Sequence, residues 1–582
     1  MKGTTMKTTI LILALFTAIC YGYTDISGDL SGVLTAAGSP YHVIDDIRVA
    51  PYDTLIIEPG CSLIFQVPPY HKFVVDTGAV IKAIGTESDS IVFTAADTII
   101  GWLGMMVYYA DSACSLSYCV IEYGKARASE TEGNGGGVYA RSTCLNVSNC
   151  YFYRDSASAN GGAIYAMNTD LFINNCLFKN NSSMQYGGAM YTAQSNIFVS
   201  NSEFIENRAE SSGGGIFLWS GSCSIGNCVF QTNYAGFSGG GIRLNVNPSI
   251  LKDNIFEDNT ANGLSYSGGG ALHIDECDPQ VVRNIFINNH ATRDGGGILV
   301  RGSSPLINNN LIALNTAGND GGGLCSDSWD NPILINNTFY RNFAQDYGGA
   351  INTTGNDDPF TVIFNCIFYQ DSSGSPTRWE VYGEGSFSNC LVDSSLCSGS
   401  GINWHLGNIY ADPLFADSLC HLSTTSPCIN TGASWAYFSA LDTFIYADSI
   451  DFEGDLRPLN GSWEIGCDEI DTTLLKILDN YRRPSSFKIS PYPNPFNSAV
   501  SITAPAGAEI EIYDIEGRRI SVIPDPDRES RGMAKNLDSR FHGNDNISEF
   551  TWQPSPSIGS GIYLVRAIRD EQEVTKRIVY LK

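Results

Sequence analysis

Two aspartates, a histidine and two arginines occupy related positions in a repeating stretch, and together they could do chemistry: Arg243, His273, Asp275, Arg301 and Asp327. Asp275 and Asp327 lie two repeats apart, so their carboxylates would be roughly 9–10 Å apart if each repeat adds one strand to a sheet. That separation is close to the distance between the acid and the base of inverting glycoside hydrolases. An arginine nearby could bind a carboxylate of the substrate. Alternatively, the charges form a ladder of exposed ion pairs, each of which contributes little stability.

Aromatic residues occupy one repeat position in four earlier repeats. They are Tyr139, Tyr165, Tyr191 and Phe217, and Trp219 follows two residues after the last of them. Exposed aromatic rings can bind sugars and protein partners. These five residues are therefore candidate ligand-binding residues. The alternatives are that the rings stack only to stabilise a sheet, or that a loop covers them.

A repeat of about 26 residues positions both groups. Its first column is the small residue before a hydrophobic one: Gly137, Ala163, Ala189, Gly215, Gly241, Ala271, Gly297, Gly323 and Ala350. Asparagine dominates two further columns with the same period. One of these begins at Asn149, and the other, in an F-x-x-N setting, contains Asn181, Asn207, Asn233, Asn259, Asn289, Asn315 and Asn342. Three columns that share one period predict a solenoid.

The residues after each glycine turn predict β-strands. Hydrophobic residues alternate there, as in Val138 and Ala140, which indicates strands with one face inward. Coils of such strands stack about 4.8 Å apart, so that asparagines can form ladders and phenylalanines can stack inside. Because a strand and not a helix follows the glycines, a phosphate-binding cradle is not expected. The second and fourth residues of each strand should point outward, which places all the candidate residues on one face.

The paired stretches F-x-x-N and G-G-A-I, over about residues 135–351, resemble the repeats of chlamydial polymorphic outer-membrane proteins and related bacterial proteins. This resemblance implies an all-β chain with a right-handed parallel β-helix. It also implies a surface-exposed or secreted protein whose repeats take part in adhesion.

The sequence divides the chain into six parts. They are a signal peptide (1–22), an N-terminal cap with the first coils (23–134), regular repeats (135–400), a closing segment (401–470), a linker (471–488) and a C-terminal module (489–582). Lys2 and Lys7 precede a short apolar run, which is typical of a secretory signal peptide. We therefore expect an exported chain that does not span a membrane once the signal is removed. Cys420, Cys428 and Cys467 in the closing segment could form a disulfide.

The C-terminal module alternates in a way that predicts a small antiparallel β-sandwich. It resembles the sorting domain of the type IX secretion system and the related FlgD-like immunoglobulin-type fold, and the matching residues are Pro493, Asn494, Pro495, Phe496, Tyr513, Asp514, Gly517, Gly561 and Tyr563. The resemblance implies that the secretion machinery is a partner and delivers the protein to the outside or the outer-membrane surface of a Gram-negative-type bacterium. The alternative is an Ig-like accessory domain with no sorting role. Residues 522–546 interrupt the module, and we expect a tolerated, disordered insertion there, or else a partner-binding loop.

Charge and composition narrow the function. The formal net charge of −27 argues against binding to nucleic acid or to an anionic membrane surface. The chain has no EF-hand, no calcium nonapeptide and no paired C-x-x-C, so neither a metal nor a cofactor is expected. The preferred function is a secreted or cell-surface adhesin that binds a glycan or a surface partner. A polysaccharide lyase or glycoside hydrolase and a purely structural spacer remain the alternatives.

Overall fold

The computed structural model describes residues 22–68, 70–127, 133–246, 248–264, 267–326, 330–353, 361–375, 378–438, 441–458, 462–469, 490–492, 500–505, 509–514, 519–523, 547–554, 561–569 and 572–580. The predicted signal peptide and the predicted linker fall almost wholly outside these residues. The chain forms two compact units, Met1–Thr472 and Thr473–Lys582. Within the described residues, no helix is both long and apolar enough to cross a membrane.

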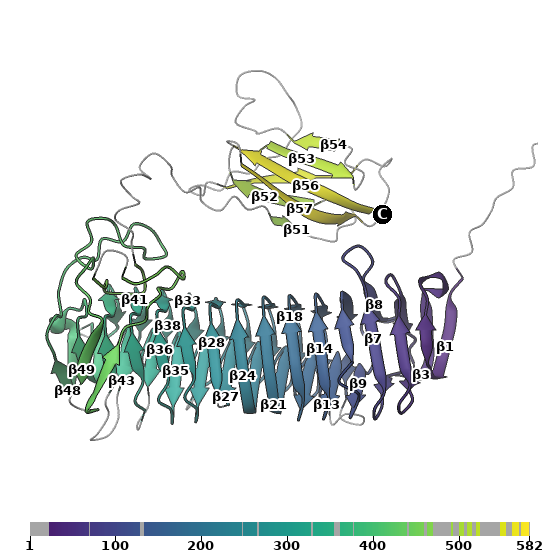
Figure 1. Ribbon diagram of the computed structural model, residues 1–582, viewed down its shortest axis with the longest axis horizontal. Helices are drawn as coiled ribbons and strands as arrows, with labels where there is room; N and C mark the ends of the chain where they lie inside the picture. The colour runs from purple at the N-terminus through teal and green to yellow at the C-terminus, as the bar shows by residue number, and fades with distance from the viewer. Residues whose placement is uncertain are drawn as a thin grey trace, which may run out of the picture. The chain divides into compact units, whose positions relative to one another are not determined.

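The first unit is a parallel β-solenoid that runs from β1 (Thr24–Asp29) to β48 (Cys397–Trp404) (Figure 1). A regular coil has four strands, as in β13 (Val138–Arg141), β14 (Cys144–Ser148), β15 (Tyr151–Tyr153) and β16 (Ser156–Ala157). The first three belong to a 38-stranded sheet, and the fourth to a 10-stranded sheet. The strands after the glycine turns are β9 (Met105–Tyr108), β13, β17 (Ile164–Met167), β21 (Met190–Ser200), β24 (Ile216–Gly226), β27 (Ile242–Asn245), β31 (Leu272–Asp275), β35 (Ile298–Arg301), β39 (Leu324–Ser326) and β43 (Ile351–Thr353). The predicted period and strand positions are confirmed.

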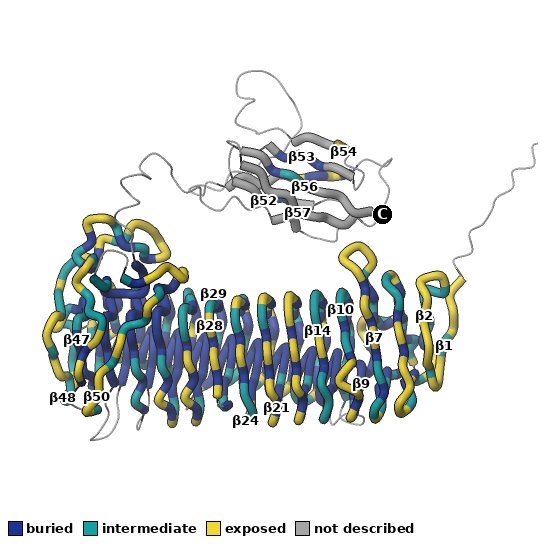
Figure 2. The backbone as a smooth tube through the Cα atoms, viewed as in Figure 1, coloured by how far each residue is buried: buried dark blue, intermediate teal, exposed yellow. Residues whose placement is uncertain are grey.

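Phenylalanine side chains are buried in the interior of the coils, and Figure 2 shows buried residues along the length of the solenoid. One ring per coil occupies the same position, because neighbouring strands such as β15 and β19 (Leu177–Lys179) pair in register. The ring centroids of successive members are 4.7–4.9 Å apart, and the members are Phe152, Phe178, Phe204, Phe230, Phe256 and Phe286. The predicted stack of phenylalanines is confirmed.

A ladder of buried asparagines runs beside these rings. In Asn207, the side-chain Nδ2 donates to Oδ1 of Asn233 (3.0 Å) and to the carbonyl oxygen of Phe178 (2.9 Å). The backbone N–H of Asn207 also donates to Oδ1 of Asn233 (3.1 Å). Each amide therefore satisfies the main chain of a corner that no strand pairing reaches. The same pattern extends from Asn181 to Asn342 and ends on the buried carboxyl group of Asp371.

Replacing Asp371 with asparagine should stabilise the protein above pH 7. Burial raises the pKa of Asp371 to about 7, so the carboxyl group folds more favourably when it is protonated. Its ionisation destabilises the fold as the pH rises from about 4 through 7, whereas an amide cannot ionise. A shift of about three pKa units corresponds to on the order of 4 kcal/mol, part of which is offset because the Tyr369 N–H loses its acceptor. Denaturant unfolding at pH 5 and pH 8 measures this effect. The gain should be clearly larger at pH 8 than at pH 5, because most of the pH range between the two pKa values lies above pH 5. The exposed Asp346→Asn serves as the control.

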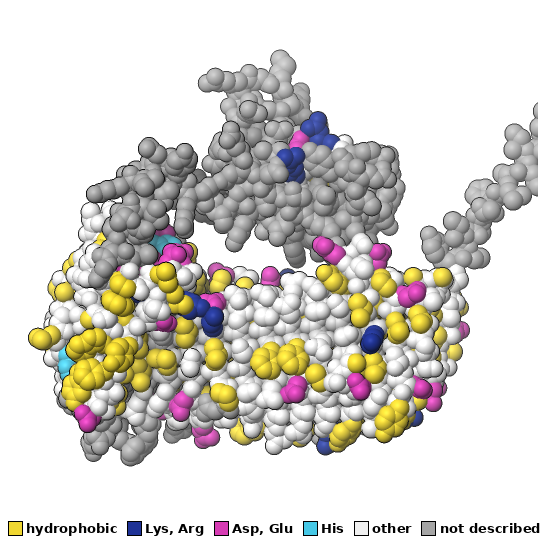
Figure 3. Space-filling view, in the orientation of Figure 1, with side chains coloured by type: hydrophobic (Ala, Val, Ile, Leu, Met, Phe, Trp, Pro, Cys, Tyr) yellow, Lys and Arg dark blue, Asp and Glu magenta, His cyan; other side chains and the backbone are white. Residues whose placement is uncertain are grey.

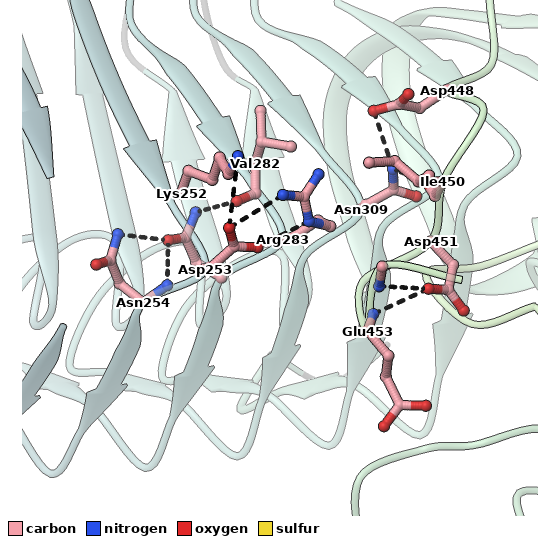
Figure 4. A network of polar contacts seen from close by, with 12 residues as sticks. Lys252, Asp253, Asn254, Val282, Arg283, Asn309, Asp448, Ile450, Asp451 and Glu453 are labelled. Atoms are coloured by element: carbon pink, nitrogen blue, oxygen red, sulfur yellow. Dashed lines mark hydrogen bonds and ion pairs between the residues drawn. The ribbon is translucent and has the colours of Figure 1, made fainter. Parts of the chain in front are cut away.

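The closing segment lies along one flank of the solenoid and packs on the last coils. Its main chain accepts hydrogen bonds from corner asparagines: Nδ2 of Asn309 donates to the Ile450 carbonyl (2.8 Å), and Nδ2 of Asn365 donates to the Ala433 carbonyl (2.8 Å). Figure 4 shows Asn309 beneath this segment, with Asp253 and Arg283, which occupy the same corner column in earlier coils and form an ion pair. Earlier members of the column, such as Asn201, are exposed. The last members of the asparagine column that begins at Asn149 therefore provide the surface on which the closing segment packs.

The cysteines in the described part of the chain are free thiols, and most of them are buried. Cys119, Cys150 and Cys176 stack in one column, where the N–H of Cys150 lies 3.4 Å from Sγ of Cys176. These repeat cysteines therefore pack in the interior of the coils. Cys420, Cys428 and Cys467 are buried free thiols too, so the expected disulfide is not formed in this structure.

The second unit contains two antiparallel sheets. One consists of β51 (Ser490–Tyr492), β52 (Val500–Pro505) and β55 (Ile547–Trp552), and the other of β54 (Arg519–Ile523), β53 (Glu509–Asp514), β56 (Gly561–Arg569) and β57 (Gln572–Tyr580). Tyr513 and Asp514 end β53 and pair with the start of β56, which contains Gly561 and Tyr563. The Ig-like sandwich itself stays a prediction. Pro493, Asn494, Pro495, Phe496, Gly517 and residues 524–546 of the insertion lie outside the described residues.

Candidate functional site

The glycine turns cover the face on which the sequence places its candidate residues. Gly213 has a φ of 69°, and a Cβ atom there would lie 2.8 Å from Cβ of Phe217, the second residue of the next strand. At Gly321 the corresponding atom would lie 2.7 Å from Cβ of Cys325. The turn therefore runs directly over that second residue. The prediction that the second residues are exposed is wrong for Tyr139, Phe217, His273, Leu299, Cys325 and Asn352, all of which are buried.

The predicted aromatic ladder exists, but most of it is unsuited to bind a sugar. Tyr139, Tyr165, Tyr191 and Phe217 are nearly parallel to their neighbours, and successive centroids are 5.1–5.4 Å apart. The faces of the inner rings are therefore covered by other rings, whereas a sugar packs against a free face. Tyr186 lies in the glycine turn that precedes Tyr191. Its ring also packs on Phe217 of the next coil, with a centroid distance of 4.8 Å. The stacking of these four rings favours the alternative that they stabilise the sheet.

Trp219 is the exception among the five aromatic candidates. Its side chain is at the fourth position of the strand, beyond the cover of the turn, and 46% of its surface is exposed. The residues opposite it in the neighbouring coils are Ala193 and Asn245, neither of which has an aromatic ring. The ring of Phe217 in the same strand lies nearly parallel to the indole, with the ring centroids 6.4 Å apart, and the exposed part of the Trp219 side chain remains accessible to a ligand.

Uncharged polar side chains follow Trp219 around the next corner. Ser222 Oγ donates to Oδ1 of Asn196 (2.7 Å), whose Nδ2 donates to Oδ1 of Asp170 (2.8 Å). Gln194 is exposed at the same corner of the preceding coil. We call Gln194, Asn196, Trp219 and Ser222 the Trp219 surface. Few charged side chains lie over the central coils on the face shown in Figure 3.

The repeat spacing could have indicated two polar members of this surface, Asn196 and Ser222, together with the neighbouring Asp170. Asp170, Asn196 and Ser222 are 26 residues apart, one per coil, like the columns that define the repeat. They were missed because the side chains differ in type, so that only the period connects them.

Only some of the charged candidate residues contact one another in the described part of the chain. Arg243 Nη2 lies 2.6 Å from Oδ2 of Asp275, and Arg243 Nη1 donates to Oγ of Ser212 (3.2 Å). Arg301 is opposite Asp275 in the next coil. The carboxylate that was expected to act as acid or base is therefore held in an ion pair, which agrees with the alternative of a charge ladder.

His273 is buried beside this pair and is inaccessible to a ligand in solvent. Neither of its ring nitrogens has a hydrogen-bond partner among the described residues. Burial lowers the pKa of His273 well below its usual value, and the positive charges of Arg243 and Arg301 lower it further. The imidazole is thus neutral and packed between coils. Asp327, the other predicted carboxylate, lies outside the described residues.

Residues 104–279 match a family model described as the right handed beta helix region. The match extends from just before β9 into the coil of β31, and it identifies these coils as a right-handed parallel β-helix. Neither a curated protein nor a solved structure matches the chain. The similarity to known proteins therefore concerns the fold of the central coils.

Proposed function

We propose that the protein is a secreted or cell-surface recognition scaffold, and that it binds uncharged polysaccharide through the Trp219 surface. The observation that carries this proposal is the exposure of Trp219 next to a row of amide and hydroxyl groups. An indole supplies a flat apolar face for a sugar ring, and planar amides supply hydrogen bonds to its hydroxyl groups. The formal net charge of −27 disfavours polyanionic ligands.

The proposal that the protein is delivered to the cell surface rests on the sequence patterns at the two ends of the chain. The N-terminal pattern is typical of a signal peptide, and the C-terminal residues resemble a type IX sorting domain. The antiparallel sheets of the second unit are compatible with that resemblance. We therefore propose the type IX secretion machinery as a partner in export.

Binding is favoured over cleavage because the charged candidate residues in the described part of the chain are either paired or buried. Asp275 forms an ion pair with Arg243, and His273 is buried. A general base needs a free lone pair within reach of the substrate. The polysaccharide lyase or hydrolase thus remains the second candidate, and it rests on Asp275 and Asp327.

Replacing Trp219 with alanine should weaken polysaccharide binding at least tenfold, since a central aromatic contact commonly contributes more than about 1.4 kcal/mol. Retention on immobilised neutral β-glucans, mannans and xylans measures the effect. Trp435→Ala is the matched control, because Trp435 is equally exposed but lies in the closing segment. Equal retention of the wild type and Trp219→Ala on every bound polysaccharide would refute the role of this surface.

A further inference from the structure

Three loops of the closing segment bring a histidine and two carboxylates together. His421 follows Cys420 in the first loop, Glu453 lies in a tight turn, and Asp468 precedes Glu469 near the end of the segment. One donor atom from each of these three residues lies within 4.8 Å of the others. The group is unrelated to the Trp219 surface, which belongs to coils far earlier in the chain.

The imidazole of His421 is oriented for a ligand on Nε2. Its Nδ1 lies 2.5 Å from Oδ2 of Asp417, while Oδ1 of Asp417 accepts the N–H of Leu419 (2.9 Å) and so holds that carboxylate in place. Nε2 is buried, has no hydrogen-bond partner among the residues that the structure describes, and lies 3.4 Å from Oε1 of Glu453. Histidines that bind a metal commonly have a carboxylate on one ring nitrogen, while the other nitrogen faces the metal. In His421, the other nitrogen faces acidic oxygens.

The two carboxylates are also fixed in position. Oδ1 of Asp451 accepts the N–H groups of Glu453 (3.0 Å) and Gly454 (2.9 Å), and it thereby shapes the turn that presents Glu453 (Figure 4). Oδ2 of Asp451 accepts the N–H of Glu469 (3.1 Å), which ties this turn to the loop that carries Asp468. Asp468 is buried, and its Oδ2 accepts the Leu422 N–H (2.7 Å) next to His421.

We propose that His421, Glu453 and Asp468 form a divalent transition-metal site of the zinc class that clips the three loops of the closing segment together. One imidazole nitrogen and two carboxylate oxygens suit Zn²⁺, and three protein ligands leave room for water. Tetrahedral coordination at about 2.1 Å separates ligand atoms by roughly 3.4 Å, which is the distance already found between His421 and Glu453. Glu453 is on the surface and can adjust its rotamer to complete the site.

A second group of similar composition is less suitable. Asp45, Asp46 and His71 lie together on the first coils. There, however, Lys72 already uses both oxygens of Asp46: its N–H donates to Oδ1 (3.1 Å), and its Nζ lies 3.6 Å from Oδ2. A cation at this place would have to displace an ammonium group.

The test is zinc binding by the purified full chain after treatment with a chelator and dialysis. Titration calorimetry with Zn²⁺ should show a site that Glu453→Gln weakens by more than the 10–100-fold typical of an outer-shell change. Thermal melting should rise with Zn²⁺ in the wild type and not in Glu453→Gln. Because Glu453 is exposed, this variant should fold normally, and its melting temperature in chelator should equal that of the wild type.

Two further variants complete the test. Asp45→Asn, which alters the group on the first coils, should bind zinc like the wild type. Asp417→Asn should weaken zinc binding roughly tenfold, because it releases the Nδ1 side of His421. Unchanged zinc affinity and unchanged stabilisation in Glu453→Gln would overturn the proposal, as would zinc affinity that disappears in Asp45→Asn alone. In either case, His421 and its carboxylates form only an ion-pair network.

Discussion

Asn233→Ala should lower the free energy of unfolding by on the order of 4 kcal/mol. Oδ1 of Asn233 accepts both the N–H (3.1 Å) and the Nδ2–H (3.0 Å) of Asn207. Its own Nδ2 donates to the Phe204 carbonyl (2.8 Å) and to Oδ1 of Asn259 (2.9 Å). The substitution leaves several of these buried groups without a partner, and each one costs about 1–3 kcal/mol. Denaturant unfolding measures the loss.

Asn196→Ala is the matched control for this prediction. Asn196 also bonds its neighbours in the two adjacent coils, but it is exposed, and water can replace those bonds. We expect this control to lose less than about 1 kcal/mol. Equal losses in the two variants would show that the buried ladder has no special part in stability.

Arg457→Met should destabilise the closing segment by about 3–5 kcal/mol, the usual result of removing one partner of a buried ion pair. Arg457 Nη1 lies 3.6 Å from Oε2 of Glu469, and both side chains are fully buried. Nη2 also donates to the Gly466 carbonyl (2.9 Å). Without the guanidinium group, Glu469 is left as a buried charge.

Hydrogen exchange and denaturant unfolding can locate this loss. Exchange should accelerate at Ile465 and Gly466, whose N–H groups bond to the Cys428 and Asn365 carbonyls, while the central coils stay protected. Arg208→Met is the control, because Arg208 pairs with Glu210 at the exposed surface and such pairs contribute less than about 1 kcal/mol. Equal effects of both variants would contradict the account of the closing segment.

The regular features of the fold follow directly from the sequence. Gly187 and Asn181 recur with one period because every coil meets the same corner geometry, and hydrophobic alternation fixes which side chains face inward. The alternation within a strand and the stacking of coils both identify the same inward residues. The side chains of the interior could therefore be predicted one by one.

The outer face was harder to predict for a physical reason. Alternation separates inward from outward residues, but it does not reveal that the glycine turn folds back over the second residue of the strand. Alternation places His273 and Tyr139 among the outward residues, but both are buried under that turn. The fourth position of the strand, which contains Trp219 and Asp275, lies farther from the turn, and Trp219 is exposed there.

The closing segment could not be resolved from sequence because it has no period. His421, Glu453 and Asp468 are spread over three loops, so no ligand spacing connects them, and no metal was expected. What brings them together is the docking of this segment on Asn309, Asn336 and Asn365. That contact depends on tertiary packing and not on a local motif.

The central claim is that the solenoid recognises polysaccharide without cleaving it. The direct measurement incubates the purified chain with a panel of polysaccharides and records both retained protein and released product, as reducing ends and as unsaturated sugars. We predict retention that falls in Trp219→Ala and no product from any polysaccharide. Product that is formed by the wild type and lost in Asp275→Ala would contradict the claim and identify an enzyme.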